Sequence, residues 1–138
     1  MAEALILDSE AVNALANPAE RGSSTNRARA ILAVAHEMRA LVRVPAPVLA
    51  EVCRGSRFDV AVERLLTDRG IGVHDLQRAA AQRAGNLLAK AKLPSTHAVD
   101  AFVVAIALEF DSAVIATGDP TDIKRLAAPF KNVTVLSL

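Results

Sequence analysis

The stretch STHAVDAFVVAIALEFDSAVIATGDPTDIKRL, residues 95–126, decides the fold of this chain. It predicts an almost wholly apolar helix, then a short apolar strand over residues 113–116, then a second helix that begins at Asp119. Acidic residues lie at the entrance and the exit of this apolar segment: Asp100 near the start of the first helix, and Asp119 and Asp122 after the strand. The placing of these three carboxylates indicates a functional site.

Other short apolar runs predict the strands of a parallel sheet covered on both faces. Such runs, separated by helical patterns, are typical of α/β proteins. The predicted strands cover residues 4–7, 41–44, 70–73, 113–116 and 133–136. The predicted helices cover residues 9–17, 27–40, 47–52, 59–68, 75–91, 95–108 and those after Asp119, and polar residues 18–26 form a loop. With no repeat or linker, the chain is expected to form one α/β domain, residues 1–138.

Composition limits the class of protein. Aromatic residues make up only 3% of the sequence, and a net charge of +1 excludes a strongly basic nucleic-acid coat, although not a local basic rim. The single cysteine, Cys53, excludes an internal disulfide framework, fits a reducing compartment and is expected to be buried. The longest apolar run, residues 101–108, is too short to span a membrane, and no export signal precedes it. The expected location is therefore the cytoplasm.

Carboxylates follow two of the predicted strands. Asp8 ends the first strand and Asp119 comes shortly after the fourth, so the two converge if these strands are neighbours where the strand order reverses. Glu51 and Asp100, near the starts of their helices, then approach from the sides. Four carboxylates in one cleft repel one another and raise each other's pKa unless a cation neutralises them. Oxygen ligands in this number suit magnesium or manganese better than zinc.

Each acid also has an ordinary structural interpretation. Asp8, Asp75 and Asp119 stand where a side chain caps the following helix. Asp122 favours the positive end of its helix, and Glu51 fits a solvent-facing helix position. The sequence leaves these alternatives open for each acid taken singly; their joint placement favours a site.

Other chemistries have weaker support. The sequence has no phosphate loop of the form G-x-x-x-x-G-K-[ST], no G-x-G-x-x-G after the first strand and no G-x-S-x-G turn. Its three histidines and one cysteine form no paired zinc motif. His97, three residues before Asp100, fits either a base or phosphate contact in the cleft or a partly exposed residue at the start of a helix.

The ordered set of acids resembles a known family. LILDSEAV with Asp8, VLAEV with Glu51, VDAFVVAIAL with Asp100 and IATGDPTDIKRLA with Asp119 resemble the PIN-domain ribonucleases, and more narrowly the VapC-type toxins of bacterial toxin–antitoxin pairs. The segment AGNLLAKAKL before the third acid is also similar to those toxins. The resemblance covers essentially the whole chain and implies a five-stranded parallel sheet in the order 3-2-1-4-5, flanked by helices.

The resemblance also implies a site and its cofactor. Asp8, Glu51, Asp100 and Asp119 would be the catalytic carboxylates of a cleft that holds one or two Mg²⁺ or Mn²⁺ ions. Asp122 matches a further acid of this branch and would add a metal ligand. Ser9 and Thr117 match small hydroxyl residues that support the cleft through hydrogen bonds. His97 departs from the pattern, since some relatives carry an acid there.

The implied activity is hydrolysis of RNA phosphodiesters by a metal-activated water, with tRNA or ribosomal RNA as the usual target. The implied partners are a VapB-like antitoxin, laid against the helices at 27–40 and 48–54, and a second copy of the chain, with assembly into a toxin–antitoxin hetero-oligomer. The basic residues expected to hold RNA at the rim are Arg21, Arg27, Arg29, Arg54, Arg57, Lys124 and Arg125. The alternatives are a non-catalytic PIN-like module that binds RNA or protein, and a receiver-type phosphoacceptor domain.

Overall fold

Five parallel strands form the centre of the molecule. The computed structural model describes residues 3–18 and 22–138 of the chain. The strands lie in the order β3-β2-β1-β4-β5, as the resemblance implied, and every neighbouring pair is parallel. Their bounds are β1 (Glu3–Leu7), β2 (Leu41–Pro45), β3 (Gly72–His74), β4 (Ser112–Thr117) and β5 (Val133–Ser137). The receiver alternative is wrong, because domains of that type have the order 2-1-3-4-5.

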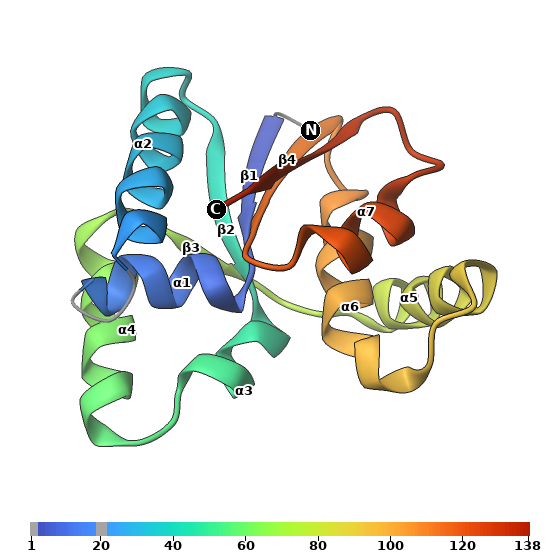
Figure 1. Ribbon diagram of the computed structural model, residues 1–138, viewed down its shortest axis with the longest axis horizontal. Coiled ribbons are helices and arrows are strands. Elements are labelled where there is room, and N and C mark those ends of the chain that lie inside the picture. The colour runs from blue at the N-terminus through green and yellow to red at the C-terminus, as the bar shows by residue number, and fades with distance from the viewer. Residues whose placement is uncertain (1–2, 19–21) are drawn as a thin grey trace.

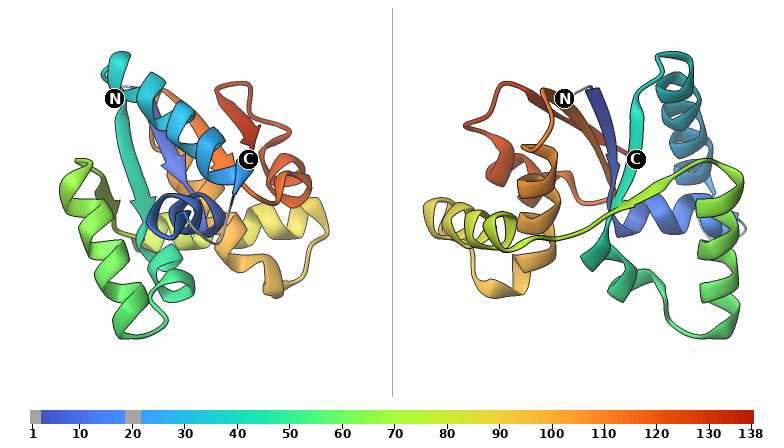
Figure 2. Two further views of the ribbon diagram at one scale, coloured as in Figure 1. Left: turned by 60° about the vertical axis from the view of Figure 1, so that its left-hand side comes forward. Right: turned by 180° about the vertical axis from the view of Figure 1, so that it is seen from behind.

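Helices cover both faces of the sheet. The first face carries α1 (Ser9–Ala16), α2 (Ser23–Glu37) and α4 (Ser56–Asp68), and the opposite face carries α5 (Arg78–Ala91), α6 (Ala98–Ala107) and α7 (Pro120–Ala127) (Figure 1). The view from behind shows the same two groups with the sheet between them (Figure 2). The short elements η2 (Ala46–Val48), α3 (Leu49–Val52) and η3 (Ser95–His97) lie beyond the carboxyl ends of the strands.

Helix α6 is the core helix that the sequence predicts. Six of its ten residues are buried, three of them alanines: Ala101, Val103, Val104, Ala105, Ile106 and Ala107. A helix that is apolar around most of its circumference is stable only when neighbours enclose it, and α6 packs against α5, α7 and the sheet. This enclosure fixes the first turn of α6, and with it Asp100, against the carboxyl edge of the sheet.

Several local predictions differ from the structure, among them the start of α4, which lies at Ser56 rather than at residue 59. Helix α2 begins at Ser23 rather than Arg27, because the Thr25 hydroxyl is buried and donates to the Ala14 carbonyl at 2.8 Å, which anchors the first turn. The remaining part of the predicted loop, residues 19–21, lies outside the described residues. Asp75 does not cap α5, since the chain stays extended to Gln77 before the helix starts. Cys53 is exposed rather than buried, as it follows the last turn of α3.

Among the described residues, no helix is both long enough and apolar enough to cross a membrane.

Candidate metal centre

The topology places a switch point between β1 and β4. The chain runs from β1 outward to β3, then returns to the other side of β1 to form β4. Leu7 pairs with Ala116, so Asp8 and Thr117 follow side by side at the carboxyl ends of the two central strands. Ligands of open α/β sheets bind at this position. The candidate site therefore lies under β1 and β4, with α3 and the start of α6 beside it (Figure 1).

Asp8 is a buried carboxyl with two roles. It caps α1, because its Oδ1 accepts a hydrogen bond from the Ala11 amide at 2.9 Å, so the capping interpretation is confirmed for this residue. Only 5% of Asp8 is exposed, and burial raises its pKa from 3.8 to about 6. The negative charges of Glu10 and Asp100 raise the pKa further, whereas hydrogen bonds from Thr117 and Ala11 oppose the rise. Capping a helix does not require a carboxylate to be buried, so the burial of Asp8 is consistent with a second role in the candidate site.

Thr117 forms hydrogen bonds with two of the acidic residues. It is fully buried at the end of β4, and its hydroxyl bonds to the Asp8 carboxylate. The same oxygen, Oγ1, accepts the Asp119 amide at 3.0 Å, which fixes the turn after the strand. Thr117 therefore links the acid after β1 to the acid after β4. The structure gives Ser9, the half-buried first residue of α1, no such link within its described part.

Asp100 is the acid whose pKa is affected by the charges of several of the other predicted acids. It lies in the first turn of α6, half-buried, and the loss of solvation raises its pKa. The charges of Asp119, Asp122 and Glu51 raise that pKa further, and His97 opposes them. Because charges act in this way only at short range, α3, α6 and α7 bring these acids together around one space. The structure thus gathers the predicted acids at one edge of the sheet.

A more compact group forms within this set. His97 Nδ1 lies 3.2 Å from Asp122 Oδ2 and 3.8 Å from Asp100 Oδ2. One potential ligand atom from each of the three residues lies within 4.8 Å of the other two. Among the described residues, this is the group of histidine, cysteine and acidic side chains with the spacing of a metal site. Asp8, Glu51 and Asp119 lie around it rather than within it.

Asp119 and Glu51 have exposed side chains at the border of the group. Asp119 occupies the N-cap position of α7, but its side chain makes no capping hydrogen bond, so the capping interpretation is wrong for its carboxylate. Glu51 is on α3, where its neighbours Val48 and Val52 are buried and fix the helix while the glutamate points outward. Both carboxylates therefore remain available to a ligand.

The sequence interpretation left one feature of this site open and missed another. For His97 it offered a contact in the cleft and a partly exposed position at the start of a helix as alternatives, and the structure places its Nδ1 3.8 Å from Asp100 Oδ2. It missed Glu10, whose charge acts on Asp8 and whose side chain lies against Gly118. A Cβ atom at Gly118 would lie 2.6 Å from both Cβ and Cγ of Glu10. Glycine therefore lets the loop after β4 pass over α1.

Gly118→Ala is expected to lower the free energy of unfolding by about 1–3 kcal/mol, as for overpacking in a well-packed region. Relief of the clash must move either the Glu10 side chain or the loop that carries Asp119. The control is Gly85→Ala on α5, where a new Cβ meets nothing within 4 Å and alanine should stabilise the helix by up to about 1 kcal/mol. Urea denaturation of wild type and both variants measures these changes. A free energy of unfolding for Gly118→Ala equal to that of wild type would contradict the prediction and show that Glu10 moves aside freely.

Comparison with known proteins places this chain in a family. The family model described as PIN domain matches residues 5–129. The chain belongs to the PIN domain family, whose members are generally nucleases. No curated protein matches the sequence closely enough to count as a relative. Among solved structures, the chain is similar to one in the crystal structure of VapBC2 from Rickettsia felis bound to a DNA fragment from their promoter, with 14% identity, 98% of each chain covered and a TM-score of 0.65. At this identity the likeness concerns the fold.

Proposed function

We propose that this protein is a metal-dependent endoribonuclease, a hydrolase of the VapC toxin type that cleaves RNA phosphodiesters. The observation that carries the proposal is the mutual effect of the acids: Asp119, Asp122 and Glu51 raise the pKa of Asp100, and Asp100 raises that of Asp8. Such repulsion destabilises the fold unless a cation relieves it. Membership of the PIN domain family supports the nuclease activity.

The residues present fit a divalent ion. Five carboxylates offer oxygen atoms, the ligands that Mg²⁺ and Mn²⁺ prefer. Asp100 and Asp122 have carboxylate oxygens close enough to share one ion, and Asp8 would hold the ion from the sheet side. Glu51 and Asp119, which are exposed, would complete the set or bind a second ion. Burial, and after it the negative charge of the neighbouring acids, raises the pKa values of Asp8 and Asp100, and a bound ion would neutralise that charge.

The chain's own residues then divide the work of hydrolysis. A bound Mg²⁺ or Mn²⁺ supplies an activated water and offsets the charge that develops on the phosphate. Thr117 holds the Asp8 carboxylate in place, and the enclosure of α6 holds Asp100. A carboxyl with a raised pKa suits proton transfer near neutral pH, so Asp8 and Asp100 are the two candidates for accepting the proton of the water.

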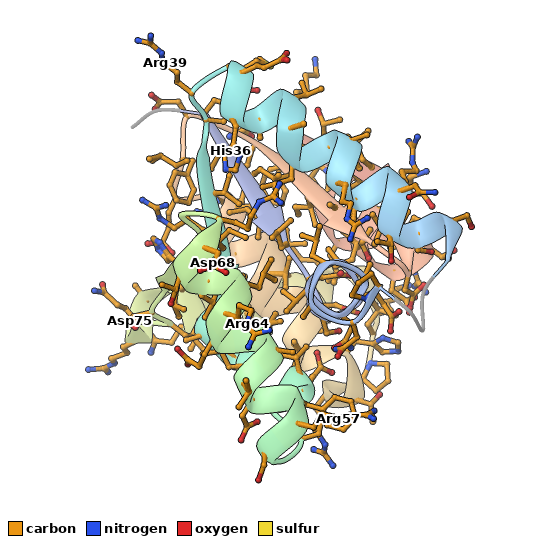
Figure 3. The ribbon with its side chains drawn as sticks, turned by 90° about the vertical axis from the view of Figure 1, so that its left-hand side faces the viewer. His36, Arg39, Arg57, Arg64, Asp68 and Asp75 are labelled. Atoms are coloured by element: carbon orange, nitrogen blue, oxygen red, sulfur yellow. The ribbon has the colours of Figure 1, made fainter. Side chains whose placement is uncertain are left out.

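Basic residues near the acids would hold the RNA backbone. Arg54 is exposed between α3 and α4, and Arg57 is exposed at the start of α4, where its guanidinium lies 4.9 Å from the centre of the Phe58 ring (Figure 3). Lys124 is exposed on α7. Two other candidates are occupied within the chain: Arg27 donates to the Ser137 carbonyl, and Arg125 donates to the Ala91 carbonyl.

The two remaining candidates for the rim support the proposal less. Arg29 is on α2 beside α4, on the first face of the sheet, and Arg21 lies outside the described residues. Contacts from basic side chains at the rim would recognise the charge and shape of the RNA backbone more than its bases.

A protein partner would cover the apolar surface of α2. Val34 and Met38 are 52% and 61% exposed, and with Ile31, Val114 and Leu136 they border an apolar hollow of about 250 Å³ between α2 and the sheet. Exposed apolar patches of this kind mark interaction sites. The likeness in fold to a VapBC2 chain supports a VapB-like antitoxin as the partner. Val48 and Val52 are buried, so the predicted second edge at 48–54 contributes little.

Val34→Glu is expected to weaken binding of an antitoxin at least about tenfold, since it puts a charge into an apolar contact. The partner to test is the product of a short reading frame beside the gene, co-expressed and purified with this protein. Val73→Glu, an exposed valine at the edge strand β3, is the matched control. Equal loss in both variants would argue against the α2 surface.

The experiment that tests the activity is an RNA cleavage assay with and without Mg²⁺ or Mn²⁺, with tRNA and ribosomal RNA as substrates. Cleavage that requires the ion supports the nuclease, whereas RNA binding without cleavage would favour a non-catalytic PIN module. Size-exclusion chromatography with light scattering tests the further parts of the proposal, a homodimer and a toxin–antitoxin hetero-oligomer. A cytoplasmic location belongs to the same proposal.

A further inference from the structure

His97 gives this site a nitrogen atom among its oxygen ligands. His97 ends η3 and occupies the N-cap position of α6, and its Nδ1 lies 3.2 Å from Asp122 Oδ2 of α7 and 3.8 Å from Asp100 Oδ2 of α6. Around an ion with bonds of about 2.1 Å, neighbouring ligand atoms lie about 3.0 Å apart and opposite ones about 4.2 Å apart. The group, whose ligand atoms lie within 4.8 Å of one another, needs only small side-chain movements to close on an ion.

We propose that Nδ1 of His97 is a direct metal ligand and that it shifts the preference of the site from Mg²⁺ toward Mn²⁺ and the later divalent metals. The inference rests on the proposed function, because it concerns the same metal centre. Magnesium prefers oxygen ligands and gains little from imidazole, whereas affinity for nitrogen-containing sites rises from manganese through iron, cobalt and nickel to copper, with zinc below copper. An aspartate at this position would give a set of oxygen ligands only.

The two other histidines of the chain are placed differently. His74 is at the end of β3, where its Nε2 lies 3.4 Å from Glu109 and its ring contacts Phe110. It therefore pairs with one carboxylate, as His97 does with Asp122, but no second acid completes a metal group around it among the described residues. His36 is exposed near the end of α2, which leads into the start of β2 at the edge of the sheet opposite the carboxyl ends of the strands (Figure 3). His74 is the matched control for a histidine paired with an acid.

A protonated His97 is the competing account of the same geometry. In that account the imidazolium forms ion pairs with Asp100 and Asp122 and takes the place of an ion in balancing their charge. The two accounts differ in what happens when a metal is added. If His97 is a ligand, its Nδ1 binds the added metal ion. If it is an imidazolium, its positive charge repels the ion, and the side chain has to move away from Asp100 and Asp122 before the ion can bind.

The test is electron spin-echo spectroscopy of Mn²⁺ bound to the metal-free protein, together with calorimetric titration of Mn²⁺ and Mg²⁺. The wild type should show coupling of manganese to ¹⁴N, and so should His74→Asn. The coupling should disappear in His97→Asp, and the preference for Mn²⁺ over Mg²⁺ should fall at least about tenfold, in the range found when groups that tune a metal site are removed.

Two outcomes would overturn the proposal, and they separate it from the proposed function. Tight binding of Mn²⁺ without ¹⁴N coupling in the wild type would leave the metal centre in place and exclude His97 as a ligand. Binding of neither ion, in wild type or His97→Asp, would contradict the metal centre itself. The wild-type spectrum decides the question even if the variant does not fold.

Discussion

Asp100→Asn is expected to lower the rate of metal-dependent RNA cleavage by at least about 100-fold. Loss of a residue that merely orients a metal ligand commonly costs 10- to 100-fold in affinity or activity, so loss of a ligand carboxylate should cost at least about the upper figure. Asp100 is the residue whose pKa responds to Asp119, Asp122 and Glu51, so its charge is central to the group. The measurement is the single-turnover cleavage rate at saturating Mn²⁺ and again at saturating Mg²⁺.

Asp75→Asn is the matched control for this prediction. Asp75 also follows a strand at the carboxyl edge of the sheet, but it is exposed, projects at the outer side of the molecule (Figure 3), and does not act on the pKa of Asp8 or Asp100. The Asp75→Asn variant should cleave RNA at the wild-type rate. Cleavage by Asp100→Asn within a few-fold of wild type would remove Asp100 from the active site.

Asp8→Asn is expected to abolish cleavage and at the same time to stabilise the metal-free fold at neutral pH. The carboxyl titrates at about 6 in the folded protein instead of 3.8, so between these values the folded state binds more protons than the unfolded state. The free energy of unfolding therefore falls as the pH rises from about 4 to about 6, by about 3 kcal/mol for a shift of about 2 units. Asparagine, which stays neutral and still accepts the Ala11 amide, avoids this loss.

Urea denaturation at pH 4 and pH 7.5, in the presence of a chelator, measures this effect. The variant should match the wild type within about 1 kcal/mol at pH 4 and exceed it by about 2–3 kcal/mol at pH 7.5. Saturating Mn²⁺ should reverse the order, because the ion stabilises the folded wild type that binds it and the variant binds it weakly. A variant less stable than wild type at both pH values would show that the hydrogen bonds of the Asp8 carboxylate stabilise the fold more than its burial destabilises it, which contradicts the prediction.

The strands and the core helix could be predicted because their signals are local. The apolar runs around Leu5 and Ile115 are uninterrupted, as buried parallel strands require, and the apolar face of α6 extends almost all around the helix. The order of the strands in the sheet could not be predicted in this way, because the periodicity of a sequence does not determine which strands pair. It followed from the resemblance carried by acids such as Asp8 and Asp100, and the structure has the same order.

Features that depend on side chains meeting across elements could not be predicted. His97 and Asp122 belong to different helices, and only the packing of α6 against α7 brings Nδ1 to a carboxylate. The contact of Glu10 with Gly118 depends in the same way on the position of α1 under the loop after β4. Asp75 fits the pattern of a helix cap, but the chain between β3 and α5 is too extended for its side chain to reach the helix.

The most direct test of the metal-dependent nuclease is cleavage of purified tRNA and ribosomal RNA by wild type and Asp100→Asn, first in chelator and then with Mn²⁺ or Mg²⁺ restored. If the acids form a catalytic metal centre, neither protein should cleave RNA in chelator, and only the wild type should cleave it after Mn²⁺ or Mg²⁺ is added. Cleavage by the wild type that continues in chelator, or equal cleavage by both proteins with the ion, would contradict it.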